Sequence, residues 1–117
     1  MRSISVEVMD QTFGRPAEGV PVALSCEVDA VWQTMLSART DATGGVVGQR
    51  ISRACGRYRL AVDLDGYFSA MGLEPLVSSL DFCFRVTRPY ENVRLLVAVT
   101  PAALSVRRLT TVDRPSG

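Results

Sequence analysis

The residues best placed to do chemistry lie on the second face of three segments in which apolar and other side chains alternate. The first segment carries Glu7, the second Arg94 and the third Arg107. Arginine presents a fixed fork of donors that suits carboxylates and polarised carbonyls. A carboxylate whose pKa is raised toward neutrality can act as a general acid or base. The combination predicts acid–base chemistry in which Glu7 moves a proton and Arg94 holds an oxyanion or a carboxylate.

The same faces also carry apolar side chains among the charged ones. A half-apolar outer face on adjacent strands indicates a buried interface or a ligand groove. We therefore expect a substrate to contact Met9, Leu96, Ser105 and Arg107. The alternative is that Glu7 and Arg94 form a structural ion pair, within the chain or across a subunit interface.

Composition excludes several other kinds of chemistry. The chain has 117 residues, no histidine and 13 basic residues, all of which are arginine. An imidazole base, a Ser-His or Cys-His pair and a histidine metal ligand are therefore excluded, as is a lysine Schiff base. We expect no metal and no other cofactor. A net charge of +1 gives no electrostatic footprint for nucleic acid.

The three cysteines, Cys26, Cys55 and Cys83, are odd in number and widely spaced. No pair has the spacing of zinc ligands, so free thiols in a reduced cytosolic chain are the simplest interpretation. Cys55 lies in a glycine-flanked turn, but no imidazole could activate it as a nucleophile. The sequence shows no signal peptide and no apolar run that could span a membrane.

The elements that position the site are short strands. Period-2 alternation and turn residues at even spacing predict seven or eight strands and an all-β sandwich or barrel. The expected strands are 4–10, 20–26, a run through Trp32 to residue 40, 46–51, 58–64, 80–86, 92–100 and 104–112, with one short helix in 66–72. We expect one domain over 1–112, a disordered tail over 113–117, and core positions for Trp32, Tyr67, Phe82 and Phe84.

Several segments in order resemble the transthyretin family, which includes the thyroid-hormone carrier and the 5-hydroxyisourate hydrolases. The resemblance runs from Ile4 to about Thr110. It is carried by the first strand ending in Asp10, Gly14-Arg15-Pro16-Ala17 with Gly19-Val20-Pro21-Val22, Trp32 with Thr40-Asp41-Ala42 and Gly44, Gly56-Arg57-Tyr58, Asp63 to Gly72 with Tyr67, Pro75 with Phe82 and Phe84, and Leu95 to Pro101.

The resemblance implies a transthyretin-like, two-sheet antiparallel sandwich with one short helix. It also implies a homotetramer, built as a dimer of dimers around a central channel. In the hydrolases the active sites lie in that channel, and by this resemblance the face with Glu7, Arg94 and Arg107 lines it.

The departures from the hydrolase pattern fall at the catalytic positions. The family's two histidines fall at Glu7 and Arg94, and its catalytic arginine falls at Gly45. Of the C-terminal Tyr-Arg-Gly-Ser motif only Arg108 matches, so Arg108 is expected to bind substrate. The carrier's aromatic pair is replaced by Ala102 and Leu104, which leaves hormone carriage unsupported.

The sequence thus predicts a divergent family member that is not a 5-hydroxyisourate hydrolase. The leading hypothesis is an enzyme of biosynthetic tailoring that opens, closes, dehydrates or isomerises a small cyclic or carbonyl-containing metabolite. The alternative is a non-catalytic carrier or interaction module on the same fold. Tyr90 and Glu91 would lie at the channel mouth.

Overall fold

The computed structural model describes residues 2–51, 56–88 and 91–112. Over these residues it contains nine strands and one short helix. The expected tail over 113–117, Cys55 and Tyr90 lie outside the described residues. No helix in the described ranges is long and apolar enough to cross a membrane.

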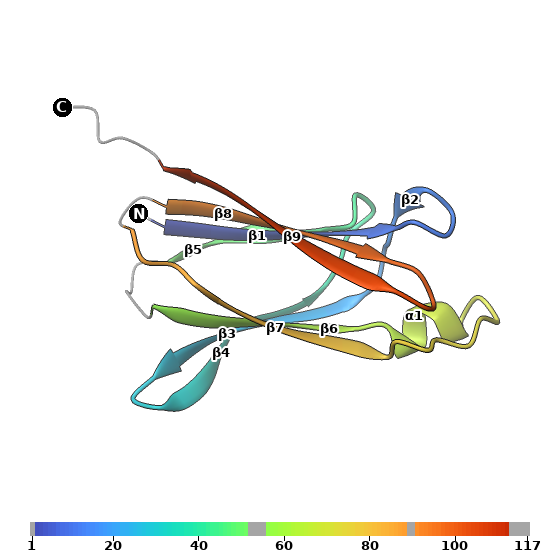
Figure 1. Ribbon diagram of the computed structural model, residues 1–117, viewed down its shortest axis with the longest axis horizontal. Coiled ribbons are helices and arrows are strands. Elements are labelled where there is room, and N and C mark those ends of the chain that lie inside the picture. Colours follow the sequence, from blue (N-terminus) through green and yellow to red (C-terminus); the bar gives the residue numbers. More distant parts are fainter. Residues whose placement is uncertain (1, 52–55, 89–90, 113–117) are drawn as a thin grey trace.

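Two sheets pack face to face (Figure 1). One sheet has the order β2-β1-β8-β9, with β5 also pairing along β1, and the other has the order β4-β3-β6-β7. The strands of the first sheet are β1 (Arg2–Asp10), β2 (Arg15–Pro16), β5 (Gly45–Ile51), β8 (Glu91–Val99) and β9 (Leu104–Val112). Those of the second are β3 (Pro21–Val28), β4 (Val31–Arg39), β6 (Arg57–Asp63) and β7 (Ser79–Arg85), and helix α1 covers Asp65–Ser69.

The expected two-sheet sandwich with one short helix is confirmed, with two local differences. β1 and β8 pair in parallel, whereas every other pairing is antiparallel. A parallel pair needs a long crossover connection, which the strands between β1 and β8 supply. The second difference is β2, which is not among the expected strands; a strand of two residues is too short to show alternation.

The core lies between the sheets and follows the alternation of the strands. Ile4, Val6 and Val8 of β1 are buried, as are Val93, Leu95, Val97 and Val99 of β8. Successive side chains of a strand point to opposite faces, so the intervening residues of both strands must face outward. Burial of this β-branched face therefore fixes which residues reach the candidate site.

Trp32 departs from its expected core position. It pairs with Glu27 on the outward face of the four-stranded sheet, and it is absent from the core cluster of the described residues. The guanidinium carbons of Arg57 and Arg59 lie 5.7 and 4.7 Å from the centre of its ring. Cation–π contacts of this kind allow a tryptophan to remain partly exposed. The other three aromatic expectations hold, since Phe84 is buried and Tyr67 and Phe82 pack against the core.

The expectation of free thiols is also corrected. Cys26 is disulfide-bonded, whereas Cys83 is free and exposed. Cys26 is buried with Val22 and Leu24, because alternation along β3 turns all three side chains to the same face. Burial alone does not reveal whether a thiol has a covalent partner, because free and bonded cysteines are both commonly buried.

Candidate functional site

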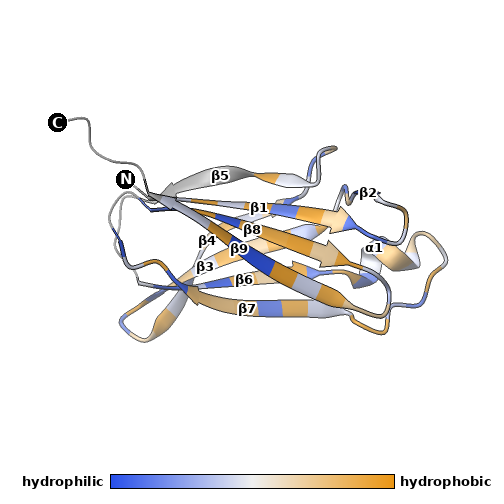
Figure 2. Cartoon of the chain, turned by 45° about the horizontal axis from the view of Figure 1, so that its top comes forward, coloured by the Kyte–Doolittle hydropathy of each residue, from blue (hydrophilic) through white to orange (hydrophobic). Residues whose placement is uncertain are grey.

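Six of the seven predicted site residues share the outward face of β1, β8 and β9. The strand register pairs Glu7 with Leu96 and Met9 with Ala98 between β1 and β8. Between β8 and β9 it pairs Leu96 with Arg107 and Ala98 with Ser105. Figure 2 shows hydrophilic and hydrophobic bands side by side on these three strands. The residues gathered on this face are Glu7, Met9, Arg94, Leu96, Ser105 and Arg107.

Glu7 and Arg94 form an ion pair at the centre of this face. Nη2 of Arg94 donates a hydrogen bond to Oε2 of Glu7 at 3.3 Å. The side chains are 38% and 59% exposed, respectively. A pair that is open to water contributes only about 0–1 kcal/mol to stability. Both groups can therefore turn to a bound molecule at small energetic cost.

The pair lines an open depression of about 290 Å³. Thr43 of the turn before β5, together with Gly45 and Val46 at the start of β5, supplies the opposite wall. Gly45 lies directly across from Glu7 in the pairing of β5 with β1. The structure thus brings Glu7, Gly45 and Arg94 together in one depression. These are the three positions at which the family resemblance expects two histidines and an arginine.

A hydrogen-bonded turn fixes the wall formed by Thr43 and Gly45. Oδ1 of Asp41 accepts hydrogen bonds from the Thr43 amide at 2.8 Å, the Thr43 hydroxyl at 2.6 Å and the Gly45 amide at 3.2 Å. The side-chain bond from Thr43, followed by the two amide bonds, lowers the pKa of Asp41. The Asp41 carboxylate is therefore charged at neutral pH and can accept all three hydrogen bonds.

Gly44 allows the turn to approach β1 closely. Its φ is +78°, which favours glycine, and a Cβ there would collide with the carbonyl oxygen of Val8. The Val8 amide donates to the Gly44 carbonyl at 2.7 Å. Thr43 was not among the predicted site residues. The Asp41–Gly44 turn motif was the signal that could have pointed to it.

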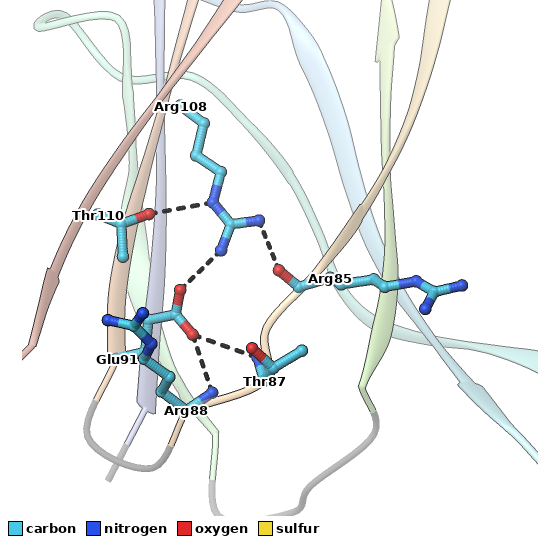
Figure 3. Close-up of polar contacts among 6 residues, drawn as sticks. All are labelled: Arg85, Thr87, Arg88, Glu91, Arg108 and Thr110. Atoms are coloured by element: carbon cyan, nitrogen blue, oxygen red, sulfur yellow. Dashed lines mark hydrogen bonds and ion pairs between the residues drawn. The ribbon is translucent and has the colours of Figure 1, made fainter.

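Arg108 does not join the other predicted site residues. It pairs with Leu95, which is buried, and so lies on the inward face of β9. Figure 3 shows its guanidinium between Glu91, Thr110 and the carbonyl of Arg85. Nη2 of Arg108 lies 2.7 Å from Oε1 of Glu91, and the guanidinium also lies 5.9 Å from the centre of the Phe84 ring. Its contacts join β9 to Arg85 at the end of β7 and to Glu91 at the start of β8.

Glu91 is also placed differently from the expected channel mouth. It is buried, and its Oε2 accepts hydrogen bonds from the amides of Thr87 and Arg88 at 3.2 and 3.1 Å (Figure 3). Burial acts to raise the pKa of Glu91, but the Arg88 amide bond, the Arg108 guanidinium and the Thr87 amide bond outweigh it. The pKa of Glu91 is therefore lowered, and the carboxylate is charged in the folded protein.

Asp10 ends β1, as expected, and its carboxylate orders the loop that follows. Its carboxylate is fully buried and accepts a hydrogen bond from the Thr12 amide at 2.9 Å. It also accepts the hydroxyl proton of Tyr67 at 2.6 Å. Burial, followed by this hydrogen bond to Asp10, raises the pKa of Tyr67 to about 12. Asp10 lies on the inward face and is not part of the Glu7 depression.

Two other features of the described residues bear on the choice of site. A larger open cavity of about 780 Å³ lies beside α1, but neither Glu7 nor Arg94 lines it. The smaller depression is the better candidate active site because both Glu7 and Arg94 line it. Over the described ranges, no group of three or more Cys, Asp or Glu side chains is gathered in a way that could hold a metal ion.

Comparison with known proteins places the chain in a family. The family model described as HIUase/Transthyretin matches residues 4–108. The 5-hydroxyisourate hydrolase of Caulobacter vibrioides is 30% identical over 115 residues, which cover 92% of this chain and 98% of that protein. The 5-hydroxyisourate hydrolase of Salmonella dublin is 25% identical over 107 residues, with coverage of 90% and 79%.

Solved structures agree with these sequence relatives. The 5-hydroxyisourate hydrolase of Klebsiella pneumoniae superposes with a TM-score of 0.77 at 25% identity, over 91% of this chain and 97% of that one. Sea bream transthyretin in complex with thyroxine has a TM-score of 0.85 at 21% identity, over 96% and 98% of the two chains. The matched family model and the shared fold establish that this chain belongs to the HIUase/transthyretin family.

Proposed function

We propose that this protein is an enzyme in which Glu7 transfers protons and Arg94 holds an oxyanion or a carboxylate. The substrate is a small cyclic or carbonyl-containing metabolite, and the reaction is a ring opening, cyclisation, dehydration or isomerisation. The observation that carries the proposal is the convergence of Glu7 and Arg94 in one depression, with their charged atoms 3.3 Å apart. A proton-transfer group and an anion partner are the minimum that such reactions need.

The reaction is proposed to differ from hydrolysis of 5-hydroxyisourate. The relatives with that name are 25–30% identical to this chain. The residues expected to activate water in them are imidazoles, and this chain has no histidine. Glu7 and Arg94 carry opposite charges where apolar residues would have sufficed for packing. A charged pair at these positions supports a change of reaction rather than a loss of catalysis.

The proposed substrate contacts are Met9, Leu96, Ser105 and Arg107, which continue the face from the pair toward β9. Met9 and Leu96 offer apolar surface, and Arg107 offers a second guanidinium. Arg108 is not retained as a substrate contact because its hydrogen bonds and its ion pair with Glu91 lie on the inward side of β9.

We propose that the working form is a homotetramer whose central channel is lined by this face, as the family resemblance implies. The exposed edge strands β9 and β7 are consistent with assembly, since unpaired strand edges readily pair with another chain. Leu109, on the same face as Arg94, is 37% exposed in the single chain. Sedimentation analysis tests the assembly directly, because a monomer at working concentrations would contradict it.

The alternative function is a non-catalytic carrier or interaction module. The ion pair itself favours this alternative, because Glu7 and Arg94 already satisfy one another. The effect of the conservative variant Glu7→Gln on turnover and on ligand binding distinguishes an enzyme from a carrier. Glu7→Gln keeps the shape and a hydrogen-bonding group but removes the proton acceptor, so it abolishes turnover in an enzyme and largely preserves ligand binding in a carrier.

The experiment is a screen of small cyclic and carbonyl-containing metabolites with the purified protein, followed by variants on the substrate that responds. Glu7→Gln should lower kcat about 100-fold or more, within the range of general acid–base contributions. Glu27→Gln is the matched control, because Glu27 forms a similar exposed pair with Arg57 at 3.2 Å on the other sheet. Full activity in both Glu7→Gln and Arg94→Ala would contradict the proposal.

We propose the cytosol as the compartment on the family resemblance, since the free-thiol argument for it no longer holds at Cys26. The disulfide at Cys26 makes this proposal testable, because stable disulfides are rare in cytosolic proteins. Thiol labelling of Cys26 in intact, unoxidised cells would support the cytosol. Protection of Cys26 while Cys83 reacts would assign the protein to an oxidising compartment.

A further inference from the structure

The open cavity of about 780 Å³ beside α1 shares no lining residue with the Glu7 depression. Its walls come from β2, the loop that leads to β3, the end of β4, the end of β6 and α1. These segments meet at the end of the sandwich that carries α1 (Figure 1). Its volume is within the range of cavities that bind small molecules.

Four charged residues line this cavity: Arg15, Arg39, Glu18 and Asp63. Across the described residues, the ion pairs are Arg57–Glu27, Arg94–Glu7 and Arg108–Glu91, so none of the four is engaged in one. Three of the four form hydrogen bonds with uncharged groups instead. Arg39 donates to the Gly19 carbonyl at 3.1 Å, Arg15 to the Met71 sulfur at 3.7 Å, and Asp63 accepts from the Asp65 amide at 3.1 Å.

The register of the four-stranded sheet explains why Arg39 and Asp63 stay apart. Pro21 of β3 pairs with Arg39 of β4. Val22 of β3 pairs with Val62 of β6, which places Asp63 beside Pro21 on the other side. Arg39 and Asp63 thus stand two strand spacings apart, about 10 Å between their backbones. Pro21 forms an apolar floor between the two charges and lines the cavity with them.

A further wall is formed by Tyr67, which is held in one orientation. Its hydroxyl proton is donated to the buried Asp10 at 2.6 Å, and Asp10 is tied to the Thr12 amide. The Arg15 guanidinium also interacts with this hydroxyl, so Tyr67 holds Arg15 at the cavity wall and has no proton to donate to a ligand. Ala42, Ala70 and Met71 add apolar surface around it.

A ligand must match this arrangement of charges. A simple anion would be attracted by Arg15 and Arg39 but repelled by the carboxylates of Glu18 and Asp63. A simple cation would be attracted by the two carboxylates but repelled by the two arginines. Only a molecule with both charges can complement the two pairs together, because electrostatic complementarity penalises like charges in contact. The backbones that carry Arg39 and Asp63 are about 10 Å apart, a span that about three residues of extended peptide can bridge.

We propose that the cavity beside α1 is a binding site for a short zwitterionic peptide of two or three residues. Its carboxylate lies between Arg15 and Arg39, its ammonium group faces Asp63 and Glu18, and its apolar side chains rest on Pro21 and Met71. This site is separate from the Glu7 depression and does not depend on the function proposed for it.

The test uses the tripeptide Ala-Leu-Ala and two blocked forms of it, with binding measured by isothermal titration calorimetry on the full chain. N-acetylation removes the ammonium charge, and C-terminal amidation removes the carboxylate. The free peptide should bind, and each blocked form should bind at least about tenfold more weakly, as expected for the loss of one charged contact.

Variants assign the binding to this cavity. Arg39→Gln and Asp63→Asn should each weaken binding of the free peptide at least about tenfold. Asparagine keeps an oxygen that can accept from the Asp65 amide, so α1 should remain in place. Arg57→Gln is the matched control on the same sheet but outside the cavity, and it should leave affinity unchanged. The proposal is overturned if the free peptide does not bind at about 10 mM, if a blocked form binds equally well, or if Arg39→Gln and Asp63→Asn leave its affinity unchanged.

Discussion

Arg107 and Arg108 are neighbours in sequence but serve opposite faces of β9. Arg107 pairs with Leu96 on the outward face that carries Glu7 and Arg94. Arg108 reaches inward, and its Nη2 lies 2.7 Å from Oε1 of Glu91. The Glu91 side chain is only 6% exposed and that of Arg108 is 29% exposed. β9 thus contributes Arg107 to the candidate site and Arg108 to an ion pair with the buried Glu91.

Removing the inward arginine should cost much more stability than removing the outward one. Arg108→Ala leaves the buried Glu91 carboxylate without its cation, and breaking such a pair costs about 3 kcal/mol. Arg107→Ala, at the adjacent exposed position, should cost less than about 0.5 kcal/mol. Urea denaturation of the two variants checks this difference. Equal midpoints would show that the Arg108–Glu91 contact does not stabilise the fold.

The same carboxylate predicts how stability depends on pH. The pKa of Glu91 is lowered in the folded protein from its ordinary value of 4.5. Its contribution is therefore fully present above that value and is lost as the pH falls through the lower, folded-state pKa. The free energy of unfolding should fall in this acidic range, and Glu91→Gln should flatten that fall. A Glu91→Gln variant with the wild-type pH profile would be inconsistent with this assignment.

Tyr67 should ionise at unusually high pH. Burial and the hydrogen bond to Asp10 raise its pKa to about 12 from an ordinary value of 10. A raised pKa means that the stabilisation is present below pH 10 and is lost as the pH rises toward about 12. Ultraviolet titration of wild type against Tyr67→Phe isolates this phenol. An ordinary midpoint for the difference signal would argue against the Asp10 contact.

Gly44 should tolerate substitution less well than Gly14, although both have positive φ. A Cβ on Gly44 would collide with the Val8 carbonyl, whereas one on Gly14 would meet nothing within 4 Å. Gly14→Ala should cost about 1–2 kcal/mol from backbone strain alone. Gly44→Ala should cost more and also displace Thr43 and Gly45 from the depression. Thermal melts compare the two variants, and equal losses would refute the close approach of the turn to β1.

The alternation of apolar residues correctly predicted which face of a strand each side chain occupies. The alternation of Ile4, Val6 and Val8 placed Glu7 and Met9 outward, and the same rule placed Arg94 and Leu96. Alternation assigns faces but not the partner or direction of a strand, so the parallel pairing of β1 with β8 was not predicted. Arg108 was assigned to the site by family resemblance, although alternation on β9 placed it opposite Arg107.

Contacts between residues far apart in sequence account for what was missed. The hydrogen bond between Tyr67 and Asp10 spans 57 positions. The packing of Arg57 and Arg59 on Trp32 requires knowing that β4 and β6 both flank β3. Neither follows from local composition, because each depends on which strands are neighbours. Alternation predicted the outward face that carries Glu7 and Arg94, whereas position 45 was linked to the site only through the family resemblance.

The central claim is that Glu7 and Arg94 support a reaction other than the one for which the relatives are named. The most direct measurement is the ultraviolet decay of 5-hydroxyisourate with the purified wild-type protein. We predict that the substrate disappears at its spontaneous rate, because no imidazole is present to activate water. Turnover at the level of a 5-hydroxyisourate hydrolase measured in parallel would contradict the account.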